Sequence, residues 1–191
     1  IENPELIILD DGFQDKKIKK NKSIILINGS RGLGNNLLLP SGPLREIASL
    51  GLKKSDIIIV IGEDQSNFKE KYKDEIRKKD IFNGKVVSSE NGSNKKVFAF
   101  CGIGNNESFF ETLENNNYQV LKKLSFPDHY QYSEEEIKKL INTAKQNNLI
   151  PITTEKDIKR ISINLKNQIE YLKIKIEIDN KEELIKKLLE F

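Results

Sequence analysis

The sequence predicts an α/β protein of two domains, each built on a largely parallel sheet. One observation is the regular alternation of strand and helix patterns after residue 96, which is typical of sheets whose crossover helices lie on the sheet faces. The other is a set of short continuous apolar runs before residue 85, the pattern of strands that are buried on both faces. We expect a first domain over 1–84, a linker over 85–96 and a second domain over 97–191.

The first domain has three predicted strands and few helices to cover them. Strand patterns lie at 5–9, 23–27 and 56–61, a short helix begins near Leu44, and a charged helix carries the apolar stripe Phe68, Tyr72 and Ile76. Because a parallel strand needs cover on both faces, we expect part of this domain to lie upstream of Ile1. The sequence contains no methionine, which also favours a fragment or a processed piece.

The second domain follows a polar stretch, residues 83–96, whose Asn-Gly and Gly-Ser breaks indicate a linker or hinge. Ser133 and Glu136 form a capping-box pattern that opens a helix with one apolar face. The other patterns predict strands at 97–100, 118–126, 149–152 and 172–178, and helices at 107–115, at 155–161 and around Leu184 to Leu189. Together they predict an α/β domain with a largely parallel sheet.

The composition excludes several kinds of site. The single cysteine, Cys101, excludes an internal disulfide framework and a cysteine-based zinc site, and the single histidine, His129, excludes multi-histidine metal sites. A net charge of +3 over 191 residues gives no argument for nucleic-acid binding. The longest apolar run, Ile57–Ile61, is far shorter than the ~20 residues that span a bilayer. Arginine is scarce among the many basic residues, so each arginine merits attention.

The first candidate site is the acid pair Asp10 and Asp11, which directly follows the apolar run 6–9. Four apolar residues that lead into an acid form the Walker B pattern, in which a carboxylate holds Mg²⁺ beside a nucleotide. A divalent cation would also relieve the repulsion between the two adjacent carboxylates. The alternative is a simple turn, because Gly12 follows and Asp-Gly is a common turn dipeptide.

The second candidate site is the proline-containing loop that carries Arg45 and Glu46. A guanidinium group suits phosphate, and a neighbouring carboxylate suits a metal ion or its water ligands. The alternative is an exposed ion pair that caps a helix. The glycine-rich stretch 29–36 lacks the G-x-x-x-x-G-K-[ST] pattern of a P-loop, and we interpret it as a flexible loop.

The third candidate group follows the predicted strands of the second domain. His129 lies beside Asp128 after a proline, and an Asp–His pair can serve general-base chemistry. The alternative is a surface or hydrogen-bonded histidine with no part in chemistry. Thr154 and Asp157 lie where a helix is predicted to begin, and their alternative role is a helix cap.

Five stretches in a fixed order resemble one family, the tetraacyldisaccharide 4'-kinases. They are LDDGFQ (9–14), GNNLLLPSGPLRE (34–46), FCGIGNNESFF (100–110), FPDHYQY (126–132) and TTEKD (153–157). Each stretch alone is weak, but five in the same order are specific. The resemblance implies a P-loop-type domain, of which 1–84 is the C-terminal part, followed by a second, smaller α/β/α domain that closes over the active site.

The resemblance also implies a reaction and a set of site residues. The family transfers the γ-phosphate of ATP to the 4'-hydroxyl of a lipid-linked glucosamine disaccharide, with Mg²⁺, at the cytoplasmic face of the bacterial inner membrane. That implies a peripheral membrane contact and no nucleic-acid partner. The motif matches imply metal binding by Asp10, Asp11 and Glu46, nucleotide binding by Arg45 and Gln14, and catalytic roles for His129 and Asp128, His129 supporting an upstream aspartate.

The sequence departs from the family pattern in two respects. Asp15 stands where the family usually has histidine after DDGFQ, which places an anion beside the metal-binding acids. The P-loop, the catalytic aspartate and the membrane-associating segment of the family lie upstream of the matched stretches, so we expect this chain alone to lack kinase activity. Two alternatives stay open: another P-loop-type NTPase or small-molecule kinase with a different acceptor, and a non-catalytic α/β binding module.

Overall fold

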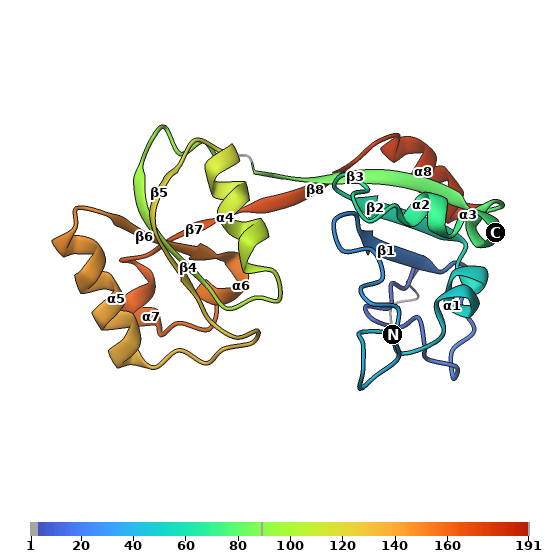
Figure 1. Ribbon diagram of the computed structural model, residues 1–191, viewed down its shortest axis with the longest axis horizontal. Helices are drawn as coiled ribbons and strands as arrows, with labels where there is room; N and C mark the ends of the chain where they lie inside the picture. The colour runs from blue at the N-terminus through green and yellow to red at the C-terminus, as the bar shows by residue number, and fades with distance from the viewer. Residues whose placement is uncertain (1–3, 89, 191) are drawn as a thin grey trace. The chain divides into compact units, whose positions relative to one another are not determined.

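The computed structural model describes residues 4–88 and 90–190, which form two compact units. Unit 1 runs to Lys85 and resumes at Glu177, whereas unit 2 is the continuous stretch Val86–Ile176. The chain therefore leaves unit 1 within one strand and returns to it within another. Both units consist of a sheet with helices on its faces, so the predicted α/β fold is confirmed (Figure 1). Among the described residues, no helix is long and apolar enough to cross a membrane.

Unit 1 is built on a four-stranded sheet with the order β1-β2-β3-β8. The strands β1, β2 and β3 run parallel, with Ile24 opposite Ile57 and Ile57 opposite Asp80. The strand bounds are β1 Ile24–Asn28, β2 Ile57–Ile61, β3 Asp80–Ser88 and β8 Ile174–Ile178, and the helices are α1 Ala48–Lys54, α2 Phe68–Lys71, α3 Lys73–Ile76 and α8 Lys181–Leu189.

The two faces of β2 are covered by helices from different parts of the chain. On one face, Ile58 and Val60 pack with residues of α1, α2 and α3, among them Phe68. On the other face, Ile57 and Ile59 pack against Phe82 of β3 and Leu184 of α8. The helix α8 therefore completes the core of unit 1, although unit 2 separates it from the rest of that unit in sequence.

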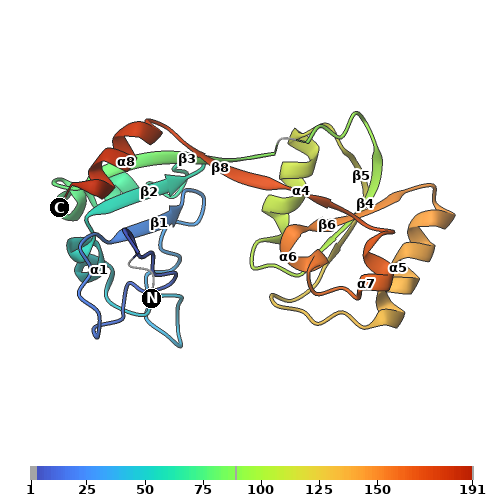
Figure 2. The same ribbon diagram turned by 180° about the vertical axis from the view of Figure 1, so that it is seen from behind.

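Unit 2 is a three-layer α/β/α arrangement around a parallel sheet with the order β5-β4-β6-β7. Figures 1 and 2 show α4 on one side of this sheet and α5 and α7 on the other. The strand bounds are β4 Lys96–Cys101, β5 Gln119–Ser125, β6 Ile150–Thr154 and β7 Glu170–Leu172, and the helices are α4 Asn106–Asn115, α5 Glu134–Gln146, α6 Glu155–Ile158 and α7 Ile163–Lys166.

The side chains of β4 alternate between the two cores of unit 2, as the pleat of a strand requires. Val97, Ala99 and Cys101 pack with the aromatic face of α4. Phe98 and Phe100 point the other way and pack with the apolar face of α5 and the segment after β6. The predicted capping box at the start of α5 forms as expected, between Ser133 and Glu136.

The structure corrects four expectations about individual elements. The single strand predicted over 172–178 is divided between β7, in the sheet of unit 2, and β8, in the sheet of unit 1. The predicted strand 5–9 does not form, and the side chains of Leu6, Ile7 and Ile8 are exposed. Within the described residues, β1 is the edge strand on that side of the sheet, and the run 5–9 does not pair with it. The single helix predicted around Tyr72 is divided into α2 and α3. The short helix α7 was not predicted.

The units also divide the chain differently from the expected domain bounds. The strand β3 runs to Ser88 and β4 begins at Lys96, so regular structure occupies part of the predicted linker 85–96. The segment from Glu177 onwards belongs to unit 1 rather than to the second domain. An apolar stripe on a helix predicts that the helix packs against a sheet, but the stripe does not show which sheet. Here α8 packs against β2 of unit 1.

Candidate functional site

The first candidate site lies in unit 1, where the LDDGFQ and LRE motifs meet. The Arg45 Nη1 donates to Asp11 Oδ2 at 2.8 Å, and Gln14 Nε2 donates to Glu46 Oε1 at 3.4 Å. These two bonds join residues that are 34 and 32 positions apart in sequence. Four of the side chains predicted for metal and nucleotide binding are therefore brought to one place.

Local backbone geometry presents both motifs at this site. Asp11 has a φ of +53°, a left-handed conformation that aspartate tolerates in turns, and the amide of Asp15 donates to the Gly12 carbonyl. The second motif lies on a loop that folds back on itself, because the Leu39 amide donates to the Leu44 carbonyl and the Leu44 amide donates to the Leu37 carbonyl. A Cβ on Gly42 would lie 2.4 Å from the backbone carbonyl oxygen of Leu37, so only glycine fits at that bend.

The pair formed by Asp11 and Arg45 is solvent-accessible, with 68% and 56% of the two side chains exposed. An exposed ion pair contributes at most about 1 kcal/mol, so both groups can exchange partners at small cost when a ligand arrives. Glu46 is better covered and receives a second contact from Lys54 at 2.6 Å. The site opens onto a cavity of about 920 Å³ in unit 1 that is lined by all five of the predicted polar residues, including Asp10.

The donor set suits a magnesium ion that is shared with a phosphate ligand rather than a closed protein site. The described part of the chain contains no group of three or more His, Cys, Asp or Glu side chains arranged to hold a metal. Magnesium in phosphate-binding sites typically takes one or two carboxylates, with water and phosphate oxygens completing the shell. The adjacent Asp10 and Asp11 fit that requirement, and Arg45 fits a phosphate that lies next to them.

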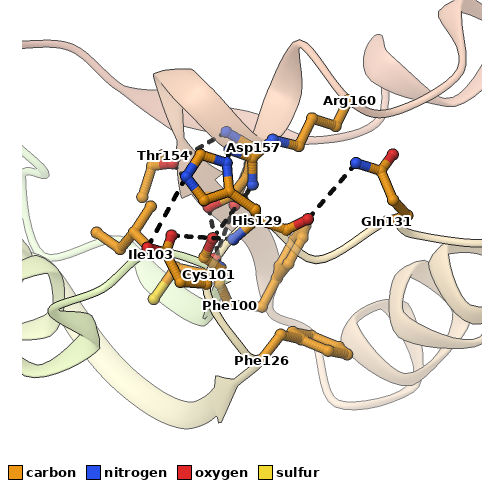
Figure 3. A network of polar contacts seen from close by, with 12 residues as sticks. Phe100, Cys101, Ile103, Phe126, His129, Gln131, Thr154, Asp157 and Arg160 are labelled. Atoms are coloured by element: carbon orange, nitrogen blue, oxygen red, sulfur yellow. Dashed lines mark hydrogen bonds and ion pairs between the residues drawn. The ribbon is translucent and has the colours of Figure 1, made fainter. Parts of the chain in front are cut away.

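The second candidate site lies in unit 2, where three further motifs converge on Gly102 (Figure 3). The amide of Gly102 donates to Asp157 Oδ2 at 3.1 Å. Its carbonyl accepts from the amide of His129 at 3.2 Å and from Arg160 Nη1 at 3.2 Å. A Cβ at this position would lie 3.0 Å from the Tyr132 hydroxyl and 3.1 Å from the Pro127 carbonyl, which leaves little space for any side chain but that of glycine.

His129 is presented on the surface of this network. Its side chain is 81% exposed, its φ is +59°, and its Nε2 lies 3.9 Å from Asp128 Oδ2. The backbone amide of His129 donates to Asp128 Oδ1 at 2.9 Å, which fixes the loop. The predicted Asp–His pair is thus adjacent in space, but the distance is longer than a hydrogen bond.

Two residues of the network were given no role from the sequence. Asp157, a member of the third candidate group with a helix cap as its alternative, has a fully buried side chain and also accepts from the Thr154 hydroxyl at 2.7 Å. Arg160 lies three residues later and contacts both Asp157 and the Nδ1 of His129. The rarity of arginine was a signal that pointed to Arg160, but no motif match covered it.

Burial raises the pKa of two side chains near this network, those of Cys101 and Tyr132. Burial raises the pKa of the Cys101 thiol to about 12, and the negative charge of Asp157 adds to the effect. Burial likewise raises the pKa of the Tyr132 hydroxyl, again with a contribution from Asp157. Both groups are therefore neutral at physiological pH, so Cys101 does not supply a thiolate nucleophile.

Known proteins resemble the chain along nearly its whole length. The family described as "Tetraacyldisaccharide-1-P 4'-kinase" matches residues 1–191. The tetraacyldisaccharide 4'-kinase of Pelagibacter ubique is 37% identical over 190 residues, which cover 97% of this chain and 60% of that protein. The corresponding protein of Rickettsia typhi is 35% identical over 186 residues and 57% of its length. The chain thus spans little more than half of the curated relatives that it matches.

One solved structure has a similar fold. It is a crystal structure of LpxK from Aquifex aeolicus, described as an "apo" form in complex with ATP. The TM-score is 0.61 at 24% sequence identity, and the match covers 93% of this chain and 54% of that chain. The likeness agrees with the α/β fold of both units. Together with the family match over residues 1–191, these similarities place the chain in the tetraacyldisaccharide-1-P 4'-kinase family.

Proposed function

We propose that this chain is the C-terminal part of a kinase that transfers the γ-phosphoryl group of ATP to the 4'-hydroxyl of a tetraacyldisaccharide lipid A precursor. The observation that carries the proposal is the meeting of Asp11 with Arg45, and of Gln14 with Glu46, in a chain of this family. Carboxylates that can hold Mg²⁺ and a guanidinium group that can bind a phosphate oxygen are recurring parts of phosphoryl-transfer sites.

Different residues of unit 1 would bind the metal ion and the phosphates of the nucleotide. Asp10, Asp11 and Glu46 would hold Mg²⁺, which supplies neutralising charge to the phosphates when it is bound. Arg45 would leave Asp11 and bind a phosphate oxygen through its planar fork, and Gln14 would orient the neighbouring carboxylate of Glu46. In unit 2, His129 and Asp128 would act at the acceptor hydroxyl, where His129 supports a carboxylate that is not in this sequence.

This chain alone should lack kinase activity, because its sequence contains no G-x-x-x-x-G-K-[ST] pattern. Phosphoryl transfer depends on the amides and the lysine of that loop to hold the phosphates. The test is therefore a fusion of this chain to the part of the Pelagibacter ubique relative that it does not match. The expected result is ATP-dependent and Mg²⁺-dependent phosphorylation of a tetraacyldisaccharide by the fusion and none by the isolated chain.

Site variants and a choice of acceptor molecules distinguish the proposed lipid kinase from another small-molecule kinase and from a binding module. Arg45→Ala in the fusion should abolish phosphorylation, whereas Arg77→Ala, a change of the same kind at an exposed site in unit 1, should leave it intact. Phosphorylation of a soluble acceptor instead of the lipid would favour another small-molecule kinase. A folded fusion that binds no nucleotide would favour a binding module and refute the proposal.

A lipid-linked acceptor also implies a membrane surface, and we place this kinase peripherally at the cytoplasmic face of the inner membrane. The lysine-rich segment 16–22 is exposed over most of its length and can contact anionic headgroups. Such a contact should weaken with salt and vanish on neutral lipid. Co-sedimentation with anionic and with neutral vesicles, at two salt concentrations, measures both effects.

A further inference from the structure

The imidazole ring of His129 contacts the guanidinium group of Arg160. The Arg160 Nη2 lies 3.2 Å from His129 Nδ1, and Arg160 Nη1 donates to the Gly102 carbonyl at 3.2 Å and to Asp157 Oδ1 at 3.3 Å. Only 19% of the Arg160 side chain is exposed, compared with 81% of His129. A largely buried, anchored guanidinium group thus holds one ring nitrogen of an exposed imidazole (Figure 3).

The chemistry of the two groups fixes the direction of this bond. A guanidinium group carries five N–H donors and no acceptor, and it stays protonated at any physiological pH. The contact therefore uses the lone pair of Nδ1, and in the neutral imidazole the hydrogen resides on Nε2. The ring then offers an N–H donor at its exposed nitrogen, and the nitrogen that could accept a proton is the one covered by Arg160.

The anchor of Arg160 is rigid because it is built from buried groups. The Asp157 carboxylate is fully buried and also accepts from the Gly102 amide and from the Thr154 hydroxyl. The Gly102 carbonyl in turn accepts from the amide of His129. The backbone amide and the ring of His129 are therefore both bonded to the same network.

We propose that Arg160 is a positioning residue that fixes His129 as a hydrogen-bond donor through Nε2. On the proposed function, on which this inference rests, His129 then serves phosphoryl transfer by donating to a carboxylate or phosphate oxygen. It does not act as the general base. This assignment replaces the general-base role that the sequence alone left open for the Asp–His pair.

The first test needs no kinase activity, because His129 is the only histidine in the chain. Selective ¹⁵N-histidine labelling of the 191-residue chain gives an NMR spectrum with one imidazole, whose tautomer is read from the ring nitrogens. The neutral ring should be the Nε2–H tautomer alone, with an Nδ1 resonance displaced by hydrogen bonding. In Arg160→Lys, which keeps a cation beside Asp157 but has no fork, Nδ1 should shift to the value of free histidine.

The control for this experiment is Arg77→Lys, which removes a guanidinium group from an exposed site in unit 1 and should leave both nitrogens unchanged. Circular dichroism of each variant verifies that it is folded. An Nδ1–H tautomer in the parent chain would overturn the inference. Unchanged ring nitrogens in a folded Arg160→Lys chain would overturn it as well.

The second test uses the fusion described above. Arg160→Lys should lower kcat about 10- to 100-fold with little change in the KM for ATP, as expected when a reacting group is misplaced. In a His129→Ala background the same change should have no further effect, because Arg160 acts through the imidazole. Full additivity of the two losses would overturn the positioning role. An inactive parent fusion would instead refute the proposed function, and the NMR result would still decide the inference.

Discussion

The buried carboxylate of Asp157 allows one prediction to be worked out from the structure. Replacement by alanine removes the acceptor for the Gly102 amide, for the Thr154 hydroxyl and for Arg160, at distances of 3.1, 2.7 and 3.3 Å. Each donor left without a partner costs about 1–3 kcal/mol, and removal of one member of a buried ion pair costs about 3–5 kcal/mol in total. We therefore expect Asp157→Ala to lower the free energy of unfolding of unit 2 by about 3–5 kcal/mol.

The matched control is Glu155→Ala, which makes the same kind of change on the same helix at a side chain that is 48% exposed. It should alter stability by no more than about 0.5 kcal/mol. In urea, with a slope of about 2 kcal/mol per M, Asp157→Ala should move the unfolding midpoint down by about 1.5–2.5 M. Circular dichroism measures the midpoint, and hydrogen exchange of the Gly102 amide measures the local effect.

Asp157→Asn adds a graded test, because it keeps an acceptor oxygen but removes the charge. Its stability should lie between that of Asp157→Ala and that of the parent chain. If Asp157→Ala and Glu155→Ala differ by less than about 1 kcal/mol, the carboxylate does not hold the network together. In that case Asp157 would not anchor Arg160 rigidly either.

Three further predictions concern other parts of the fold. Leu184→Ala should destabilise unit 1 by about 2–5 kcal/mol in chemical denaturation, whereas Leu189→Ala, exposed on the same helix, should have little effect. Ser133→Ala should remove the cap of α5 at a cost of about 1 kcal/mol, and Ser133→Asp should restore it in the same measurement. Burial raises the pKa of Asp64, but hydrogen bonds from Lys69, Phe68 and Ser66 outweigh it, so the pKa lies below 3.8. The stability that Asp64 contributes is therefore complete above pH 3.8 and lost as the pH falls further, and Asp64→Asn should remove this dependence from acid unfolding curves.

Elements with their own local signals could be predicted from the sequence. The continuous apolar run of β2 and the capping box of α5 occur where their patterns indicate, because strand burial and helix capping depend on neighbouring residues. The run at 5–9 has the same apolar character as β2 but forms no strand, since a ladder requires a partner that the run itself cannot specify. The position of α8 in unit 1 depends on long-range packing in the same way.

In the candidate sites, too, the sequence identifies individual residues, whereas the contacts between distant residues depend on the fold. Asp11 and Arg45 were each found from their motifs, but their pairing across 34 positions is visible only in the fold. Thr154 and Asp157 have the sequence pattern of an ordinary helix start, and the Thr154 hydroxyl does cap α6 by accepting from the Asp157 amide at 3.0 Å. What sets Asp157 apart is complete burial next to Gly102 and Arg160, which no local pattern encodes.

The place of α8 in the chain has a consequence for synthesis. Because translation proceeds from the N-terminus, Ile57, Ile59 and Phe82 are made long before Leu184, the residue that covers them. All of unit 2 leaves the ribosome in this interval. One face of the unit 1 sheet therefore stays exposed while unit 2 is synthesised and folds. A product that terminates before Lys181 would keep that apolar face permanently open, and we expect such a product to aggregate.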